Sequence, residues 1–295
     1  MGHVGRGHAN GAGAAALSAH RRLMIDTHAH VHDKAFDDDR EAMLERARSH
    51  GITQIISVGC DLSDSVRALE CALRYHLFAS AGIHPHEAKT APPMLEAALA
   101  PLLDDAHTVA VGECGLDYYY DHSPREVQQR VLREHIALAK ARTLPLIFHQ
   151  RDAFEDFTAI LREELGGARG VVHCFTGDTH QARVLIEEFG LLLGIGGVLT
   201  FKNAQPLRDA VRTVGATHCI LETDAPYLAP VPHRGTRNEP AFVAHTAAYF
   251  AQLCALSREE VVSVTSRNAA ALFGLNRRMD ARASSFPRNT ASGSA

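Results

Sequence analysis

The chain has 295 residues, of which 46% are hydrophobic, with a formal net charge of -4 and a pI near 6.5. This length allows one large domain or two ordinary ones, and the apolar content supports a sizeable core. The weak negative charge excludes a broad surface that coats polyanions, although a local basic rim around a cleft is compatible with it. Six cysteines without a C-x-x-C pair fit a reducing compartment, so we expect a cytoplasmic protein.

Both ends of the chain differ in composition from its middle. Residues 1–22, rich in Gly and Ala, and residues 276–295 are expected to be disordered tails around one domain at residues 23–275. The first segment is a poor match to a secretory signal. No apolar segment approaches the roughly 20 residues that a membrane span needs, so we expect no membrane association.

Between the tails, short runs rich in Val, Ile and Leu alternate with longer segments of helical period. We expect strands at residues 24–30, 54–60, 78–85, 108–117, 145–152, 170–175, 191–199 and 219–226. We expect helices at residues 38–50, 64–75, 94–104, 124–142, 153–165, 179–189, 205–214 and 239–256. Strands that alternate with helices pair in parallel, and eight such units in one domain predict a closed (β/α)8 TIM barrel of the α/β class.

The predicted strand ends carry polar residues of metal-ligand type. In a TIM barrel the C-terminal ends of the strands meet at one face, where catalytic residues lie. A single histidine on an apolar strand is more often a core residue than a ligand, but convergence of the whole set favours metal binding. Four histidines and two carboxylates suit Zn²⁺ or another divalent ion, with Mg²⁺ and Mn²⁺ as alternatives. The predicted ligands are His28, His30, Glu113, His149, His173 and Asp224.

This set exceeds what one tetrahedral ion with an open position uses, so we expect two divalent ions bridged by Glu113. His28, His30 and Asp224 complete one site, and His149 and His173 complete the other. Such a pair lowers the pKa of a bound water toward about 7. We expect Asp224 to orient that water and take its proton, which makes Asp224 and Glu113 the predicted catalytic residues. The remaining pocket charge of about +1 favours an anionic substrate such as a phosphodiester.

Other residues near the strand ends have two interpretations each. Asp26 and Glu222 either orient ligand histidines or form a buried structural pair. Residues 118–120, three tyrosines, either stack on a terminal base or form a packed loop. Cations in the loops either bind phosphate or are solvated surface residues. The predicted substrate-binding residues are His84, Arg151, Lys202, Arg234 and Arg237.

The sequence resembles the TatD-type metal-dependent deoxyribonucleases of the amidohydrolase superfamily. The resemblance rests on DTHAH, GIHPHEA, VGECGLDYY, HQRDA, HCFTG, GVLTFKNA, LETDAPYL and RGTRNEP, and it covers about residues 24 to 275. It implies a TIM barrel, divalent metal and hydrolysis of DNA phosphodiesters, commonly as a 3′-5′ exonuclease. The family's metal positions fall on the predicted ligands named above. Gln150, where a serine is common, and His32, where an apolar residue is usual, depart from the family pattern.

We therefore predict an enzyme, a metal-dependent hydrolase that cleaves DNA phosphodiester bonds. The expected partner is single-stranded DNA or frayed DNA ends, contacted through phosphates. Two alternatives stay open. The same machinery could act on a small-molecule ester, amide or phosphoester, because one fold hosts many chemistries. A non-catalytic metal-binding protein is the alternative of another class.

Overall fold

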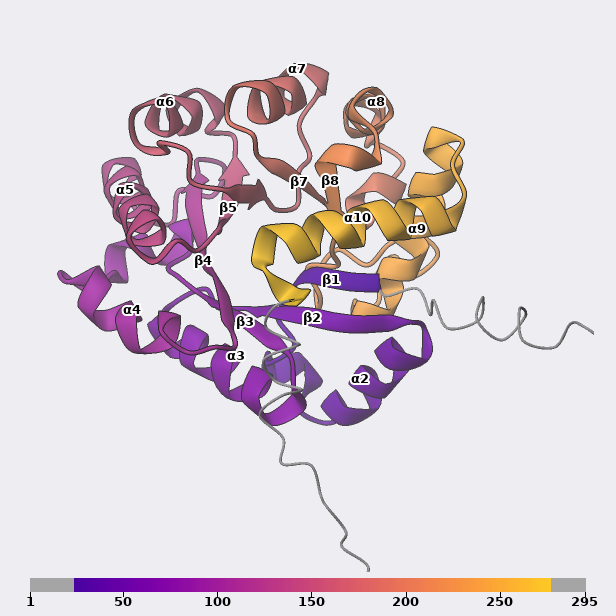
Figure 1. Cartoon of the computed structure of the whole chain (residues 1–295), viewed down its shortest axis with the longest axis horizontal. Coiled ribbons are helices and arrows are strands. Elements are labelled where there is room, and N and C mark those ends of the chain that lie inside the picture. The colour runs from indigo at the N-terminus through magenta and orange to yellow at the C-terminus, as the bar shows by residue number, and fades with distance from the viewer. Residues whose placement is uncertain (1–23, 277–295) are drawn as a thin grey trace, which may run out of the picture.

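The computed structural model describes residues 24–276, and the predicted tails lie outside this range apart from Asn276. Its centre is an eight-stranded parallel sheet in which the strands follow one another in chain order, surrounded by helices (Figure 1). The predicted TIM barrel is confirmed. The strands are β1 (Met24–Ala29), β2 (Ile52–Val58), β3 (Phe78–Ala81), β4 (Thr108–Asp117), β5 (Leu146–Arg151), β6 (Gly170–Val172), β7 (Leu192–Ile195) and β8 (Cys219–Leu221).

Helices connect successive strands and pack their apolar faces on the outside of the barrel. The α-helices are α2 (Arg40–Ser49), α3 (Leu62–Tyr75), α4 (Leu95–Leu103), α5 (Arg125–Arg142), α6 (Phe154–Glu164), α7 (Thr179–Arg183), α8 (Gln205–Val214), α9 (Val243–Cys254) and α10 (Arg258–Phe273). Helix α7 continues as a π-helical turn, η3 (Val184–Glu188). The short 3-10 turns are η1 (Lys34–Phe36), η2 (Pro85–Thr90), η4 (Gly197–Thr200), η5 (Ala216–His218) and η6 (Pro240–Phe242). No helix within residues 24–276 is long and apolar enough to cross a bilayer.

The barrel closes between β1 and the segment that follows β8. Ala29 and Ala225 form a parallel bridge. The His30 N–H donates to the Ala225 carbonyl at 2.7 Å, and the Asp224 N–H donates to the His28 carbonyl at 2.8 Å. Closure of the sheet therefore brings His28 and His30 next to Asp224, although almost 200 residues separate them in the sequence.

Several strands end earlier than the sequence predicts. β6 ends at Val172 and β8 at Leu221, and the backbone then turns away from the ladder. Cys174 and Asp224 lie in the left-handed region with φ of 43° and 58°, a conformation that extended strands do not contain. The expected strand at residues 191–199 is likewise wrong beyond Ile195, because Gly197 begins the 3-10 turn η4. Because the backbone leaves the extended conformation there, the side chains after these strands no longer alternate between the two faces of the sheet.

Helix α10 was not predicted, although its start carries a capping box. The Ser257 hydroxyl accepts from the Glu260 N–H while the Glu260 carboxylate accepts from the Ser257 N–H. Ala269, Leu272 and Phe273 of α10 pack in one buried cluster with apolar residues near the strand starts, such as Ile25 and Phe78. Figure 1 shows α10 lying across the barrel beside β1. This helix therefore covers the N-terminal end of the barrel interior and leaves the opposite end open.

A buried histidine in α5 gives this fold a predictable response to acid. His135 is fully buried, its Nδ1–H donates to the Val131 carbonyl at 2.7 Å, and its Nε2 accepts from the Ile83 N–H at 3.0 Å. Burial lowers the pKa of His135 to about 4, and the bond to Val131 only partly opposes this. The unfolded chain therefore binds a proton at this residue below about pH 6.5, where the folded chain does not.

We expect His135→Gln, which keeps an acceptor for Ile83 but cannot be protonated, to flatten the pH dependence of stability. Between pH 7 and pH 5 the wild type should lose about 2 kcal/mol of unfolding free energy more than the variant. Urea unfolding of both proteins at pH 7, 6 and 5 measures this difference. If the unfolding free energies of the two proteins changed equally with pH, the assignment of a neutral His135 in the folded protein would be contradicted.

Candidate metal centre

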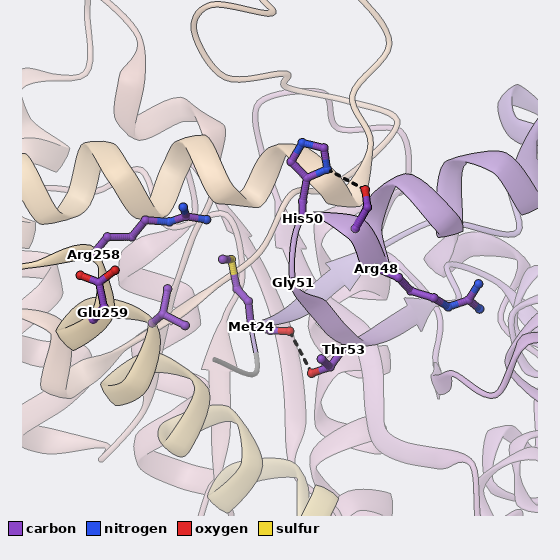
Figure 2. A pocket seen from close by; sticks show the side chains of 9 residues that line it. Met24, Arg48, His50, Gly51, Thr53, Arg258 and Glu259 are labelled. Atoms are coloured by element: carbon purple, nitrogen blue, oxygen red, sulfur yellow. Dashed lines mark hydrogen bonds between the residues drawn. The ribbon is translucent and has the colours of Figure 1, made fainter. Parts of the chain in front are cut away.

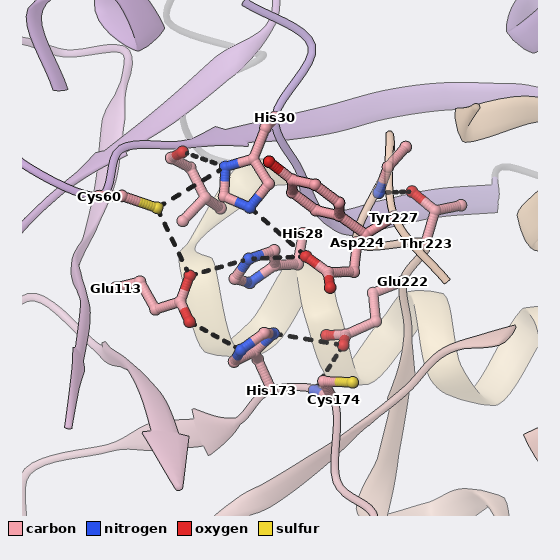
Figure 3. A network of polar contacts seen from close by, with 12 residues as sticks. His28, His30, Cys60, Glu113, His173, Cys174, Glu222, Thr223, Asp224 and Tyr227 are labelled. Atoms are coloured by element: carbon pink, nitrogen blue, oxygen red, sulfur yellow. Dashed lines mark hydrogen bonds and ion pairs between the residues drawn. The ribbon is translucent and has the colours of Figure 1, made fainter. Parts of the chain in front are cut away.

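The structure brings the six predicted ligands together at the C-terminal ends of the strands. Figure 3 shows all of them except His149, which lies beside Glu113. His28 and His30 come from the end of β1, Glu113 from β4, and Asp224 from the segment after β8. Side chains of His28, His173 and Asp224 form one group whose ligand atoms lie within 4.8 Å of one another, and His28, His30 and Glu113 form a second. Sequence positions far apart thus meet in one buried cluster.

Glu113 occupies the middle of this cluster, and its two carboxylate oxygens face different histidines. Oε2 lies 3.3 Å from His28 Nε2. Oε1 lies 2.8 Å from His173 Nε2, 3.0 Å from His149 Nδ1 and 3.3 Å from His84 Nε2. A carboxylate with this placement can give one oxygen to each of two cations.

In two of the four predicted histidine ligands, His30 and His149, the ring nitrogen that points away from the cluster has a hydrogen-bond partner. His30 Nδ1 lies 2.8 Å from the Val58 carbonyl, which can only accept, so Nδ1 carries the proton and Nε2 is left toward Asp224 at 3.4 Å. His149 Nε2 lies 3.1 Å from Asp117 Oδ2, which leaves Nδ1 toward Glu113. Metal-ligating histidines usually donate their other ring N–H to a carbonyl or carboxylate in this way.

His28 provides an independent test of whether the site suits a metal. The His28 side chain is fully buried, yet neither of its ring nitrogens has a hydrogen-bond partner. Its ring stacks on His173 with centroids 3.9 Å apart, and its Nε2 lies 3.7 Å from Asp224 Oδ1. A buried polar atom without a partner costs free energy, and a cation at Nε2 would remove that cost. The donor set therefore fits divalent metal.

Electrostatics keep both carboxylates ionised. Burial favours the neutral acid, but the charges of His173, His84 and His28 outweigh it and hold the pKa of Glu113 well below its usual value. Burial acts on Asp224 in the same direction, and the contact with His30 holds the pKa of Asp224 below its usual value. Burial lowers the pKa of His84 to about 4, so this imidazole is neutral at pH 7.

Burial opposes protonation of His30, His149 and His173, but neighbouring acidic side chains outweigh it and raise the pKa of each ring. Because metal binds neutral imidazoles and anionic carboxylates, these rings would release protons when a metal binds.

Two residues of this region make contacts that the sequence analysis did not predict. His84 was predicted only to face substrate, but its ring lies in a third ligand-type group with Glu113 and His149. Asp117, the last residue of β4, was not singled out, although its carboxylate contacts both His149 and His86, the latter at 2.8 Å. Its place in the GLDYY motif was the available signal.

The buried acids Asp26 and Glu222 separate into different roles. Asp26 accepts from the Thr223 hydroxyl and backbone N–H at 2.6 and 3.0 Å and contacts no ligand ring, and burial raises the pKa of Asp26 to about 8. Glu222 accepts from the Cys174 N–H and lies 3.6 Å from His173 Nδ1. Asp26 is thus a structural acid that ties β1 to the segment after β8, and Glu222 stands behind a predicted ligand.

His32, the departure from the family pattern, lies beside the centre in a further group with His30 and Asp64. Its Nδ1 lies 2.8 Å from the Ser57 hydroxyl and its Nε2 lies 3.0 Å from Asp64 Oδ1. Both ring nitrogens are already engaged, so His32 is a hydrogen-bonded core residue in this structure.

The predicted substrate-binding cations lie at different places around the mouth. Arg151 is exposed at the end of β5, and Lys202 and Arg234 are exposed on neighbouring loops, where the Arg234 guanidinium lies 3.8 Å from the Phe201 ring centroid. These three form no ion pair with any residue in 24–276. Arg237 differs, because its guanidinium donates to both Asp39 oxygens at 2.7 and 2.8 Å.

A hollow of about 410 Å³ lies at the opposite, N-terminal end of β1 and is a different feature (Figure 2). Met24, Gly51 and Thr53 line it on the strand side, and Arg258 and Glu259 on the α10 side. None of the ligand-type groups found in the described residues includes a residue of this hollow. The ligand-type groups of the described residues therefore lie away from this hollow, at the C-terminal ends of the strands.

Gly115 sets the distance between β4 and β5 beside the ligands. Its φ is +149°, and a Cβ at this position would overlap the His149 carbonyl oxygen. We expect Gly115→Ala to reduce the free energy of unfolding by more than about 1 kcal/mol, and to weaken metal retention by displacing His149. Gly167→Ala is the matched control, because φ is +83° there but nothing lies within 4 Å of the added Cβ. Urea unfolding should give Gly115→Ala a clearly lower free energy of unfolding than the control variant. Equal losses of unfolding free energy in the two variants would contradict the steric argument.

We expect Asp117→Asn to weaken divalent-metal binding about 10- to 100-fold, because the charged acceptor that fixes His149 is lost. Equilibrium dialysis with metal analysis measures the affinity. Asp121→Asn is the control, since Asp121 is an exposed carboxylate of the same loop that pairs with Arg125. Equal affinities in the two variants would show that Asp117 does not support the ligand.

Known proteins share this sequence and architecture. The family model of TatD related DNases matches residues 25–274. The uncharacterized metal-dependent hydrolase YabD of Bacillus subtilis is 41% identical over 259 residues, which cover 86% of this chain and 100% of YabD. The 3′-5′ ssDNA/RNA exonuclease TatD of Cronobacter turicensis is 37% identical over 259 residues, covering 85% of this chain and 97% of that protein.

Solved structures agree with the sequence comparison. YjjV, a TatD homolog from Escherichia coli K12, aligns with a TM-score of 0.81 at 32% identity, covering 86% of this chain and 99% of YjjV. The match extends over nearly all described residues, from β1 to the end of α10. The chain is therefore a metal-dependent hydrolase with a TIM-barrel fold, and it belongs to the TatD-related DNase family.

Proposed function

We propose that this chain hydrolyses DNA phosphodiester bonds as a 3′-5′ exonuclease, on single-stranded DNA or frayed ends, with two divalent ions in the ligand cluster. The division of the cluster by Glu113 carries the proposal, because its oxygens face His28 on one side and His149 and His173 on the other. Two-ion sites of this kind suit displacement at phosphorus. The similarity to the Cronobacter relative, which is named an ssDNA/RNA exonuclease, supports a single-stranded nucleic acid as the substrate.

His28, His30 and Asp224, with Glu113, would hold one ion, and Glu113, His149 and His173 the other. Zn²⁺, Mg²⁺ or Mn²⁺ in these positions would supply Lewis acidity and lower the pKa of a water toward about 7. The chain supplies the geometry around them. Val58 and Asp117 orient the rings of His30 and His149 through the bonds described above.

Asp224 is the proton acceptor in this proposal. Its side chain is 14% exposed, whereas those of His28 and Glu113 are 1% and 3% exposed, so water reaches Asp224 more readily than it reaches those two. In the hydrolysis, the water oxygen bonds to phosphorus and one phosphorus–oxygen ester bond breaks with its electron pair on the leaving sugar oxygen. Asp224 takes the water's proton and passes it to that leaving oxygen, which departs as a hydroxyl.

Substrate contacts follow from the groups that remain free at the mouth. His84, with a neutral ring and a side chain 11% exposed, faces the scissile phosphate beside Glu113. Arg151, Lys202 and Arg234 contact phosphates farther along the strand. Arg237 acts with Asp39, which already occupies its guanidinium, and is the weakest candidate of the set.

A time course on end-labelled DNA tests the function. We expect 5′-labelled single strands to shorten progressively and 3′-labelled strands to release the label at once, with duplex DNA degraded more slowly. Chelator should stop the reaction, and supplying Mg²⁺, Mn²⁺ or Zn²⁺ in turn should restore it. No DNA cleavage with any ion, together with turnover of a phosphotriester, lactone or amide, would replace this function by a small-molecule hydrolase.

We expect Asp224→Asn to lower kcat about 100- to 10,000-fold, because the proton acceptor is lost, while much of the metal stays bound. Single-turnover hydrolysis and metal analysis of the same sample separate the two effects. Asp38→Asn, at an exposed carboxylate outside the ligand cluster, is the control. Unchanged turnover in Asp224→Asn would remove this residue from the mechanism.

A further inference from the structure

Three tyrosines stand exposed around the mouth of the barrel. Tyr119, Tyr120 and Tyr227 are 57%, 49% and 55% exposed, whereas every other Tyr or Phe side chain within residues 24–276 is buried or half-buried. Tyr119 and Tyr120 follow β4, which carries Glu113, and Tyr227 lies three residues after Asp224. Exposed apolar surface that gathers at one place usually marks a binding site.

On the β4 side, aromatic rings lead from the ligand cluster to the solvent. The ring of His84 contacts that of His86 with centroids 4.4 Å apart, and His86 meets the edge of Tyr120 at 5.3 Å. Tyr120 in turn contacts Tyr119 at 4.8 Å. The Arg151 guanidinium lies 4.0 Å from the Tyr119 ring centroid and 4.9 Å from that of Tyr120. A series of π-systems with one cation therefore extends outward from the metal centre.

Asp117 fixes this series relative to the metal ligands. Its Oδ1 accepts from the backbone N–H groups of Tyr119 and Tyr120 at 3.0 and 2.9 Å. Its Oδ2 contacts His149 and His86 at 3.1 and 2.8 Å. One buried carboxylate thus positions both a predicted metal ligand and the two exposed tyrosines.

Tyr227 stands on the other side of the centre, next to His30 (Figure 3). Its ring meets the His30 ring at a centroid distance of 6.0 Å and an angle of 64°. The Tyr227 N–H donates to the Asp224 carbonyl at 2.8 Å, and its own carbonyl accepts from the Asn238 amide at 2.6 Å. The ring is exposed while the backbone that carries it is held in place.

We propose that Tyr119 with Tyr120, and Tyr227, are two stacking platforms for unpaired bases of a polynucleotide whose phosphate lies between them over the ligand cluster. This inference rests on the proposed function and adds the groups that select single strands. Every base has a π-face, so aromatic stacking binds single strands with little sequence preference. Bases inside a duplex already stack on one another, and only a single strand or a frayed end presents them to these rings.

The test measures base-dependent binding and the kinetic constants of alanine variants. We expect Tyr119→Ala, Tyr120→Ala and Tyr227→Ala each to weaken binding of a labelled oligothymidylate about 5- to 150-fold. Binding is measured by fluorescence anisotropy in the Asp224→Asn background with metal present. In the wild-type background the same changes should raise KM with kcat little changed, because stacking outside the reacting atoms contributes equally before and during the reaction.

Matched ligands and variants separate stacking from other roles of the rings. An abasic oligonucleotide of equal length keeps the phosphates, so the wild type should bind it as weakly as the alanine variants bind oligothymidylate. Tyr→Phe at each position should bind normally, because the ring remains. Met94→Ala, at an apolar residue that is 72% exposed outside the mouth, controls for general loss of exposed apolar surface. Thermal unfolding checks that each variant folds.

The outcomes distinguish this inference from the proposed function. DNA hydrolysis with unchanged KM and binding in all three alanine variants overturns the stacking platforms and leaves the nuclease intact. Tyrosine-dependent binding of intact strands without any DNA cleavage supports the platforms and overturns the nuclease. Equal affinity of the wild type for abasic and intact strands overturns the platforms as well.

Discussion

The carboxylate of Glu113 is the constraint on which the site depends. A fully buried anion is costly unless charged or hydrogen-bonding groups surround it. Here His28 faces one oxygen, and His84, His149 and His173 face the other. The histidines come from four different strand ends, so the anion holds the rim of the barrel in one arrangement. The contacts that would hold cations are consequently the same contacts that hold the strand ends in place.

Closure of the barrel also holds the candidate ligands in one arrangement. β1 meets the segment after β8 through Ala29 and Ala225, and the adjoining backbone bonds join His28 and His30 to that segment. Asp26, one layer deeper, ties β1 to Thr223. The place where the barrel closes, which has a single bridge in place of a longer ladder, is therefore the place where His28 and His30 meet Asp224. Helix α10 covers the other end of the interior, so the open end is the one that carries the candidate ligands.

Defined neighbouring side chains surround the candidate ligands. Asp117 connects His149, His86 and the backbone of the tyrosine loop, and Glu222 stands behind His173. A hydrogen-bonded partner such as Asp117 fixes the tautomer and direction of the His149 ring, which the ring alone does not determine. His32 has equally good partners in Ser57 and Asp64 and is satisfied without a metal. Histidine content alone therefore does not identify a candidate ligand. A buried ring without a hydrogen bond whose nitrogen faces two carboxylates, such as His28, is a better indication.

The sequence by itself determined the alternation of strand and helix, and hence the barrel, because side-chain periodicity follows directly from residue order. It also predicted that six candidate ligands would converge, since each lies at or near a strand end and all parallel strands end at one face. It did not determine α10, the early ends of β6 and β8, the contacts of Asp117 or the pairing of Arg237 with Asp39. Those depend on distances between loops that are 30 to about 200 residues apart, which only the packed structure sets. Tertiary structure alone also decided which nitrogen of His30 and of His149 faces the centre, because that follows from the hydrogen-bond partner on the other side of each ring.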